Sequence, residues 1–292
     1  MKAKIKIPST VLAGGRVIKY PSTRMMGVIN ATPDSFYAGS RSESVSAVLK
    51  SAEKFLACGA DFLDIGGQSS RPWSRETDEK TERLRLIAAV GAVRKRFPKA
   101  VISADTYRAS CAAAAIDCGA DIINDISALT FDPEMVSVAA RSKVPVILMH
   151  TRGKPRDMQK NTGYKDAPSE VLAWLKSRAD FAREGGIPAR KIIIDPGIGF
   201  AKLPEHNFAL LRRIDEFFQP GYPVLVGHSR KIFIGILLGS EDAPLPPDSR
   251  LSGTLAVTAY LASRGTHIVR VHDAEENAAV LKLSSALWRQ SI

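Results

Sequence analysis

The sequence has few cysteines and no long apolar run. Of its 292 residues three are cysteines, Cys58, Cys111 and Cys118, and they do not stand at the spacing of a zinc site. No stretch approaches the roughly 18 apolar residues that a membrane-spanning helix requires. Lysines interrupt the segment MKAKIKIPSTVLAGG, which therefore lacks the continuous apolar core of a secretory signal. We expect a cytoplasmic protein with reduced thiols and no membrane partner.

Aromatic residues are scarce among the basic ones. The net charge is +11, from 41 basic against 30 acidic residues, and such an excess is typical of proteins with anionic partners. The basic stretch RETDEKTERLRLIAAVGAVRKRF also carries glutamates and regularly spaced aliphatics, without the interleaved aromatics on which nucleic-acid bases stack. A solvated helix face is favoured over a nucleic-acid surface, and phosphorylated metabolites remain the anionic candidates.

Short aliphatic runs recur along the chain. Parallel strands buried on both faces have this pattern, and the predicted strands cover 25–30, 61–65, 101–105, 121–125, 144–149, 191–195, 223–227 and 267–271. Aliphatics at three- and four-residue spacing predict helices between them, for example over 43–58, 76–97, 107–118 and 205–218. The sequence therefore predicts a strand-helix unit repeated eight times.

Eight such units favour a closed (β/α)8 TIM barrel over an open doubly wound sheet. An open sheet usually carries a glycine-rich fingerprint after its first strand, and NATPDSF is not one. Residues 2–20 alternate polar with apolar around a Gly-Gly turn, as a β-hairpin does. We expect one domain over residues 1–292, with residues 1–24 forming a hairpin extension that caps one end of the barrel.

Polar residues end six of the aliphatic runs. The active site of a barrel gathers at the carboxyl-terminal ends of its strands, and the polar tips are Asn30, Asp64, Asp105, Asn124, Asp195 and His272. Carboxylates accept hydrogen bonds, whereas an amide both donates and accepts, so Asp105, Asn124 and Asp195 suit a planar heterocycle. A helix-capping role for Asp105, and a loop-backbone role for Asn30 and Asp34, stay open.

Other strand ends carry cations. VGHSRK combines a glycine, a serine and two cations at a probable helix start, where anions bind well. In RVHD, Arg270 and His272 alternate onto one face and could hold phosphate or pyrophosphate. Arg71, in GGQSSRPWS, could clamp an anion or pair with a surface acid. His150, after another strand, is expected to be an ordinary buried histidine.

Eight motifs together carry a specific resemblance. MGVINATPDSF, DIGGQSSRP, SADTYRA, GADIINDIS, PVILMH, DPGIGFAK, GHSRKIFIG and IVRVHD, running from Met26 to Asp273, closely resemble the signature of the dihydropteroate synthase family. The resemblance implies a pterin-binding TIM barrel that transfers an alkyl group in folate biosynthesis. It condenses 6-hydroxymethyl-7,8-dihydropterin pyrophosphate with para-aminobenzoate, by dissociative substitution, to give 7,8-dihydropteroate and pyrophosphate. It also implies a homodimer and a target of sulfonamides.

The resemblance assigns roles residue by residue. The pterin pocket would comprise Asp105, Asn124, Met149, Asp195, Phe200 and Lys231. Pyrophosphate would be held by Asn30, Ser70, Arg71, Arg270 and His272, with Mg²⁺ bound through Asn30. The loops and contacts around para-aminobenzoate would include Thr32, Pro33, Asp34, Phe36, Pro72 and Ser229. The residues central to catalysis would be Asp105, Asp195, Lys231, Asn30 and Arg71.

Four positions depart from the family pattern, and the first loop ends YAGSRS where an aspartate and paired glycines are frequent. Gln68 stands where a glutamate is common, Ser70 replaces a threonine, Trp73 replaces a glycine, and Ile232 replaces a serine or arginine. These changes lie on the para-aminobenzoate side, so we expect an altered affinity for the arylamine and for sulfonamides. Asp64 has no partner in this scheme and is interpreted as a structural or supporting carboxylate.

Three other functions are compatible with parts of the sequence. A pterin-dependent methyltransferase of the same fold should lack the NATPDSF and SSRP loops. A paralogue that binds pterin without condensing it is compatible with the motifs. A basic barrel that binds nucleic acid is supported by the net charge alone.

Overall fold

The computed structural model describes residues 8–31 and 41–288. Its main sheet has eight strands in the order β8-β7-β6-β5-β4-β3-β10-β9, and every paired register is parallel. The strands are β3 (Arg24–Asn30), β4 (Phe62–Gly66), β5 (Ile102–Asp105), β6 (Ile122–Asp125), β7 (Val146–Met149), β8 (Ile192–Asp195), β9 (Leu225–Val226) and β10 (Ile268–Val271). A parallel bridge between Ile194 and Val224 joins the two end strands. The predicted barrel is confirmed.

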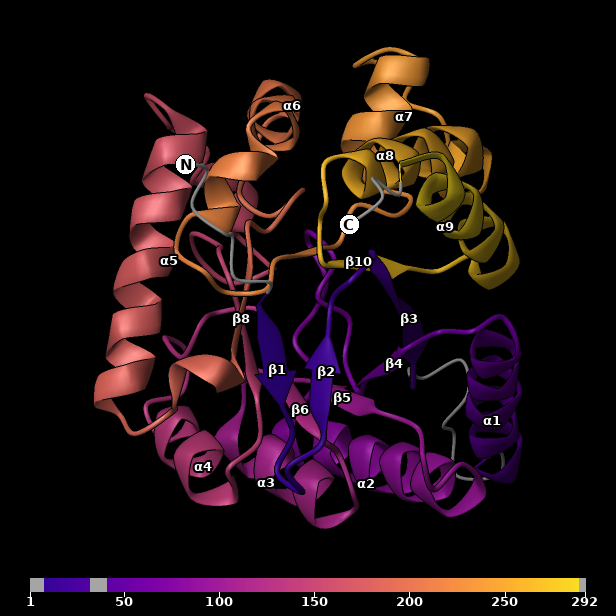
Figure 1. Cartoon of the computed structure of the whole chain (residues 1–292), viewed down its shortest axis with the longest axis vertical. Helices are drawn as coiled ribbons and strands as arrows, with labels where there is room; N and C mark the ends of the chain where they lie inside the picture. Colours follow the sequence, from indigo (N-terminus) through magenta and orange to yellow (C-terminus); the bar gives the residue numbers. More distant parts are fainter. Residues whose placement is uncertain (1–7, 32–40, 289–292) are drawn as a thin grey trace.

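Helices follow the strands and surround the barrel (Figure 1). They are α1 (Arg41–Ala57), α2 (Glu79–Arg96), α3 (Ala109–Asp117), α4 (Met135–Ser142), α5 (Ala167–Glu184), α6 (Pro204–Arg212), α7 (Ile232–Leu238), α8 (Leu251–Ser263) and α9 (Ala274–Trp288). Short 3-10 turns lie at η2 (Met158–Lys160), η3 (Ala189–Lys191), η4 (Ile214–Phe218) and η5 (Pro247–Arg250). The helix predicted over 205–218 is divided at Arg213 into α6 and η4. The tighter turn of η4 buries Ile214 and Phe217.

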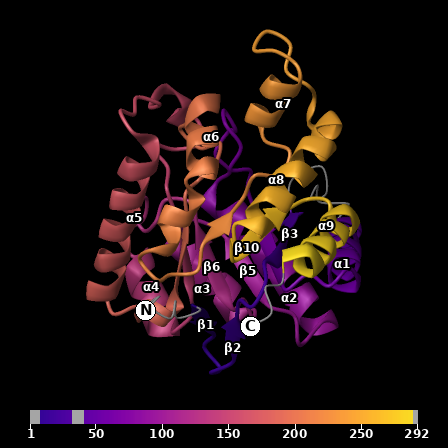
Figure 2. The same ribbon diagram turned by 45° about the horizontal axis from the view of Figure 1, so that its top comes forward.

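The predicted hairpin is also present and closes one end of the barrel. Strands β1 (Ser9–Val11) and β2 (Val17–Lys19) pair antiparallel. Leu12 and Tyr20 pack on inward side chains near the amino ends of the barrel strands, among them Met26 and Phe62. Lys191 Nζ donates to the Val11 carbonyl at 2.8 Å. In Figure 2 the hairpin lies at the end of the barrel opposite α7, so the other end is left for the site.

Inward side chains change character along the barrel axis. The hairpin end is apolar, and its inward cluster is Met26, Phe62, Val101, Ile122, Ile147, Ile193, Leu225 and Ile268. Two residues further along the strands, the inward side chains include Asp64, Ser103 and Arg270. At the ends of the strands, Asn30 of β3, Gly66 of β4 and Asp105 of β5 lie at the same level. This alternation places the polar groups above an apolar floor, because successive strand residues point to opposite faces.

Within the described residues, no helix is long and apolar enough to cross a membrane.

Candidate active site

Arg270 is the centre of an ion network inside the barrel. Its Nε donates to Asp64 Oδ2 at 2.5 Å, and its Nη2 donates to Asp105 Oδ2 at 2.7 Å. Asn124 Nδ2 donates to the same Asp64 oxygen at 2.9 Å. Four of the residues that attracted attention in the sequence therefore touch one another, although they come from four strands. Arg270 was expected beside an anion, and in this structure its contacts are with two carboxylates.

Asp105 has a strongly altered acidity. Burial raises the pKa of its carboxyl to about 7, while the neighbouring Arg270 guanidinium lowers it and the Asp64 charge raises it. The alternative role of Asp105 as a helix cap is wrong. Arg108 is the N-cap residue of α3, and the Ala109 N–H donates to Asp132 at 2.7 Å. Asp105 is thus not used as a helix cap, and its side-chain partner is Arg270.

Asp195 and Lys231 form the opposite side of this mouth. Asp195 is buried, and its Oδ1 accepts the N–H of Gly197 at 2.7 Å. Burial raises the pKa of Asp195, opposed chiefly by the positive charge of Lys231. Burial lowers the pKa of Lys231 to about 7, although Asp195 favours its charged form. Lys231 Nζ donates to the Ile198 carbonyl and lies 4.3 Å from the centre of the Phe200 ring.

A small apolar cluster lies beside these polar groups. Met149 and Phe200 pack with Tyr107, Ile126 and Met158, separately from the main core. Flat apolar surfaces next to a carboxylate, an amide and an ammonium group match a planar ligand with polar edges. The structure therefore brings together all six residues that the sequence assigned to the heterocycle, on five neighbouring strand ends and their loops.

The anion side of the site contains His272 and Ser229. His272 Nδ1 and Ser229 Oγ are 3.0 Å apart, and the His272 N–H points to the same oxygen at 3.3 Å. Burial lowers the pKa of His272 to about 4, with further lowering by Arg270 and Arg71. At neutral pH its imidazole is uncharged and can bind an anion only as a hydrogen-bond donor. The positive charge must come from the two arginines.

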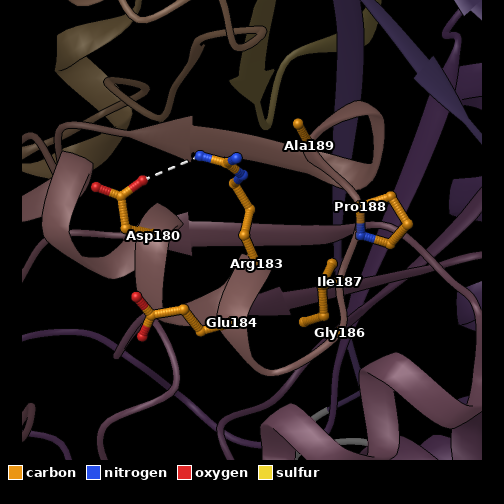
Figure 3. A pocket seen from close by; sticks show the side chains of 7 residues that line it. All are labelled: Asp180, Arg183, Glu184, Gly186, Ile187, Pro188 and Ala189. Carbon is orange, nitrogen blue, oxygen red and sulfur yellow. Dashed lines mark hydrogen bonds and ion pairs between the residues drawn. The ribbon is translucent and has the colours of Figure 1, made fainter.

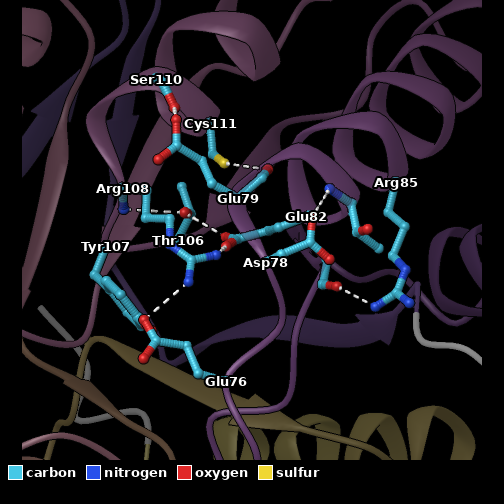
Figure 4. Close-up of polar contacts among 12 residues, drawn as sticks. Glu76, Asp78, Glu79, Glu82, Arg85, Thr106, Tyr107, Arg108, Ser110 and Cys111 are labelled. Carbon is cyan, nitrogen blue, oxygen red and sulfur yellow. Dashed lines mark hydrogen bonds and ion pairs between the residues drawn. The ribbon is translucent and has the colours of Figure 1, made fainter.

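The loop after β4 is fastened to the strand tip that bears Asp105 (Figure 4). Glu82 of α2 is fully buried and accepts from Thr106 Oγ1 and from Arg108 Nη1, each at 2.5 Å. Arg108 Nη2 also donates to Glu76 at 2.9 Å, and Arg85 Nη1 donates to the Gly67 carbonyl at 3.0 Å. The sequence predicts a solvated helix face here and does not reveal these contacts, because charged residues such as Glu82 and Arg85 are usually exposed on helices.

Lys202 is a second residue that sequence reasoning missed. It is buried, and its Nζ donates to the carbonyls of Phe200 at 2.9 Å and Gly197 at 3.0 Å. It also lies 3.0 Å from Nδ1 of His150, which is buried as expected. Burial lowers the pKa of Lys202 well below its usual value. This lysine stabilises the turn that carries Ile198 and Phe200. The one sequence feature that could have indicated this role is its position in the motif DPGIGFAK.

Trp73 occupies a backbone conformation that favours glycine. Its φ is +64°, its side chain is 61% exposed, and its N–H donates to the Pro155 carbonyl at 2.9 Å. A left-handed φ costs a residue with a Cβ atom roughly 1–2 kcal/mol. The structure thus explains why glycine is common at this position in the family that the sequence resembles.

This strain predicts different stabilities for two substitutions of Trp73. Trp73→Gly and Trp73→Ala both remove the indole, but only glycine removes the Cβ atom. We expect the glycine variant to be more stable than the alanine variant by about 1 kcal/mol, measured by urea unfolding. An alanine variant of equal or greater stability would show that the left-handed conformation is not strained.

The remaining predicted residues have simpler positions. Asn30 is exposed at the end of β3, Arg71 is exposed, and Ser70 and Pro72 are partly exposed on the loop after β4. Thr32, Pro33, Asp34 and Phe36 lie outside the described residues. Among the residues that are described, no group of three or more His, Cys, Asp or Glu side chains could hold a metal ion.

A hollow of about 490 Å³ lies elsewhere, at the end of α5 (Figure 3). Asp180, Arg183 and Glu184 line it together with the segment Gly186–Ala189, which leads towards the start of β8. It is therefore at the amino ends of the strands, away from the polar tips. The Arg183 guanidinium is already paired with Asp180 at 3.3 Å, and we assign the hollow no role.

Comparisons with known proteins agree with the geometry of the mouth. Residues 26–272 match the family described as "Pterin binding enzyme". A dihydropteroate synthase of Synechocystis is 44% identical over 267 residues, covering 91% of each chain. The Xanthomonas albilineans dihydropteroate synthase, solved with 4-aminobenzoic acid, superposes with a TM-score of 0.86 at 34% identity, covering 98% of this chain and 100% of that one. The Burkholderia cenocepacia enzyme, solved with 7,8-dihydropteroate, gives a TM-score of 0.85 at 32% identity and 96% coverage of both.

Proposed function

We propose that this chain, which belongs to the dihydropteroate synthase family of pterin-binding enzymes, is itself a dihydropteroate synthase. It condenses 6-hydroxymethyl-7,8-dihydropterin pyrophosphate with para-aminobenzoate, and the products are 7,8-dihydropteroate and pyrophosphate. The observation that carries this proposal is the convergence of Asp105, Asn124, Asp195 and Lys231 beside Met149 and Phe200 at one mouth of the barrel. Relatives at 37–44% identity over most of the chain carry the same name.

The pterin has N–H donors and a carbonyl acceptor on its edges, and the site offers complements to both. Asp105 and Asp195 accept N–H bonds, Asn124 accepts and donates, and Lys231 donates to a carbonyl or ring nitrogen. Phe200 and Met149 cover the ring faces. Burial strengthens each of these hydrogen bonds, since little water competes for them.

Arg71, Arg270, His272 and Ser70 supply donors for the pyrophosphate. Mg²⁺ fits this set because it prefers oxygen ligands, needs few from protein and binds substrate phosphates. The Asn30 amide oxygen, exposed at the tip of β3, would be its protein ligand. The ion would neutralise charge on the leaving pyrophosphate.

The reaction we propose is a dissociative substitution. The bond between the pterin methylene carbon and the bridging oxygen breaks first, and pyrophosphate keeps the electron pair. The amine nitrogen of para-aminobenzoate then attacks the methylene carbon and releases one proton. Asp105 and Asp195 stabilise the positive charge that spreads over the pterin, while Arg71 and Arg270 hold the departing anion. Thr32, Pro33, Asp34 and Phe36 would contribute to the exclusion of water from the cation.

The function is tested by following labelled para-aminobenzoate into dihydropteroate. Purified protein, the pterin pyrophosphate and Mg²⁺ are expected to give product at a rate proportional to enzyme. If a folded protein still binds the pterin substrate but gives no labelled product, the chain is instead a paralogue that binds pterin without condensing it.

Removing the metal is expected to stop the reaction. We predict a loss of more than about 100-fold in kcat after treatment with EDTA, reversed by excess Mg²⁺, because the ion neutralises the leaving group. Asn30→Ala should need a higher Mg²⁺ concentration for half-maximal rate. Full activity in EDTA would exclude the proposed metal.

The two groups with a pKa near 7 predict a narrow pH optimum. Asp105 must be ionised to stabilise the cation, so kcat/KM for the pterin substrate should fall below pH 7. Lys231 must keep its proton to donate a charge-assisted hydrogen bond, so kcat/KM should also fall above pH 7. A profile that stays flat from pH 5.5 to 9 would contradict this assignment, and Asp105→Asn should remove the acidic limb.

The arylamine side departs from the family pattern, and we propose a changed affinity for para-aminobenzoate and sulfonamides. Trp73 is strained and exposed, and Ile232 presents an apolar side chain that is 39% exposed at the start of α7. Inhibition by sulfamethoxazole is expected to differ from that of the Bacillus subtilis relative assayed in parallel. Equal inhibition constants would count against the proposal.

We also propose that the protein is a cytoplasmic homodimer. The three cysteines are unpaired in the structure, as in a reducing compartment. Large apolar side chains are exposed on the last helices, and they include Leu237 and Leu238 of α7 and Leu283 and Leu287 of α9. Sedimentation should give twice the chain mass, and Leu283→Lys with Leu287→Lys should give a monomer. A wild-type monomer at micromolar concentration would contradict the proposal.

A further inference from the structure

Asp64 is a strand-tip carboxylate that the reaction scheme leaves without a role. It lies inside the barrel on β4, level with Val28 of β3 and Ser103 of β5. Its side chain is completely buried. A buried carboxylate is costly unless charged or polar partners compensate it, so its partners show what it is used for.

A single oxygen of Asp64 serves two partners from opposite directions. Oδ2 accepts Arg270 Nε at 2.5 Å and Asn124 Nδ2 at 2.9 Å. Asn124 belongs to β6 and Arg270 to β10, and each strand is two positions away from β4 in the sheet. Asp64 therefore links a residue proposed for the pterin with a residue proposed for the pyrophosphate.

The contact with Asn124 fixes which end of the amide faces a ligand. An ionised carboxylate can only accept hydrogen bonds, so the NH₂ group of Asn124 must point to Asp64. The Asn124 carbonyl oxygen and its second N–H are then left for the pterin. Without the carboxylate the amide could rotate by half a turn and present the wrong group.

The contact with Arg270 similarly fixes the guanidinium plane. Its Nε is bound to Asp64 and its Nη2 to Asp105. Among the described residues, Nη1 has no hydrogen-bond partner. The two carboxylates thus bind the Nε–Nη2 edge of the Arg270 guanidinium. The N–H groups that remain, including those of Nη1, are held in one plane and can bind an anion.

We propose that Asp64 is a positioning residue that orients the Asn124 amide for the pterin and the Arg270 guanidinium for the pyrophosphate, and so couples the two halves of the substrate site. This inference rests on the proposed function. Asp64 itself lies below the rim and acts through its two partners.

The test compares Asp64→Asn with Ser103→Ala. Both positions are inward, adjacent in the sheet and fully buried. Within the described part of the chain the Ser103 hydroxyl has no hydrogen-bond partner, so its removal breaks no contact of the network. Asp64→Asn keeps the shape of the side chain and removes the charge.

For Asp64→Asn we expect KM for the pterin pyrophosphate to rise about tenfold or more and kcat to fall, because both partners lose their orientation. KM for para-aminobenzoate should stay within about twofold of wild type, as should every constant of Ser103→Ala. A carboxylate that only stabilises the fold would lower the unfolding temperature and leave KM unchanged. An unchanged KM for the pterin substrate would therefore overturn the proposal.

A double-mutant cycle separates positioning from general damage. Because Asp64 acts partly through Asn124 and partly through Arg270, Asp64→Asn should weaken binding of the pterin pyrophosphate by a smaller factor in the Asn124→Ala background than in wild type. Losses that multiply would overturn the proposal. Calorimetric titration with the pterin pyrophosphate gives these affinities without turnover. A wild-type protein that binds the pterin pyrophosphate but does not condense it with para-aminobenzoate would thus contradict the proposed function. The role of Asp64 could still be tested by these affinities.

A second measurement remains available if Asp64→Asn does not fold. Asn124→Ala removes one of the two donors that hold the Asp64 carboxylate in place, which should loosen the orientation of Arg270 and weaken pyrophosphate binding about threefold. Asn124 is proposed for the pterin and has no assigned contact with pyrophosphate. An unchanged affinity for inorganic pyrophosphate in Asn124→Ala would overturn the coupling.

Discussion

Replacing Asp195 by asparagine is expected to lower kcat/KM for the pterin substrate by about 100- to 1000-fold, with little change in stability. The side chain is buried, and its Oδ1 accepts the Gly197 N–H, a bond that the asparagine carbonyl oxygen can keep. What the substitution removes is the negative charge beside Lys231 and the pterin. Asp195→Ala, which also removes the acceptor, should abolish turnover.

Asp180→Asn is the matched control for this prediction. It makes the same chemical change at an exposed position on α5, at the end of the barrel away from the site. Rates of product formation and unfolding temperatures measured for both variants separate a lost charge in the site from a general effect. Activity of Asp195→Asn within about fivefold of the control would remove Asp195 from the mechanism.

Replacing Arg270 by alanine is expected to impair both stability and activity. The guanidinium side chain, 19% exposed, pairs with the buried carboxylates of Asp64 and Asp105. Removing one partner of such a pair typically costs about 3 kcal/mol or more, because uncompensated charge stays buried. The free energy of unfolding should fall by this order at pH 7.5, measured by urea denaturation, and pyrophosphate binding should be lost.

The stability loss in Arg270→Ala should shrink as the pH falls. Arg270 lowers the pKa of Asp105, so without it that pKa rises further above the value in the unfolded chain. Above about pH 7 the folded variant therefore holds a proton on Asp105 that the folded wild type has lost, so the difference in stability shrinks as the pH falls towards 7 and is constant below it, where Asp105 is protonated in both proteins. A loss that is equal at pH 7.5 and 5.5 would mean that the carboxylates do not depend on Arg270.

The barrel was predictable because its strands are buried on both faces. The aliphatic runs end where the strands end, and the predicted starts and ends lie within two residues of those of β3 to β10. The hairpin was equally readable from its alternation and its Gly-Gly turn. The pterin side followed from the same logic, since polar tips of parallel strands must gather at one rim.

The ion network was not predictable from pattern. Arg270 and Asp64 are 206 residues apart, and their contact depends on barrel closure and on a register that places both below the rim. Arg270 was therefore assigned to the anion alone, and Asp64 had no partner. The hydrogen bonds of Glu82 and those of Lys202 were not predicted for the same reason, because each set joins residues that only the folded backbone brings together.

Release of pyrophosphate tests the central claim most directly. The protein is mixed with the pterin pyrophosphate and Mg²⁺, para-aminobenzoate is added, and pyrophosphate is measured by a coupled assay. We predict one pyrophosphate for each dihydropteroate formed, a rate that depends on para-aminobenzoate, and loss of both products in Asp195→Asn. Pyrophosphate release no faster than in that variant, from folded wild-type protein, would contradict the assignment of this chain as a dihydropteroate synthase.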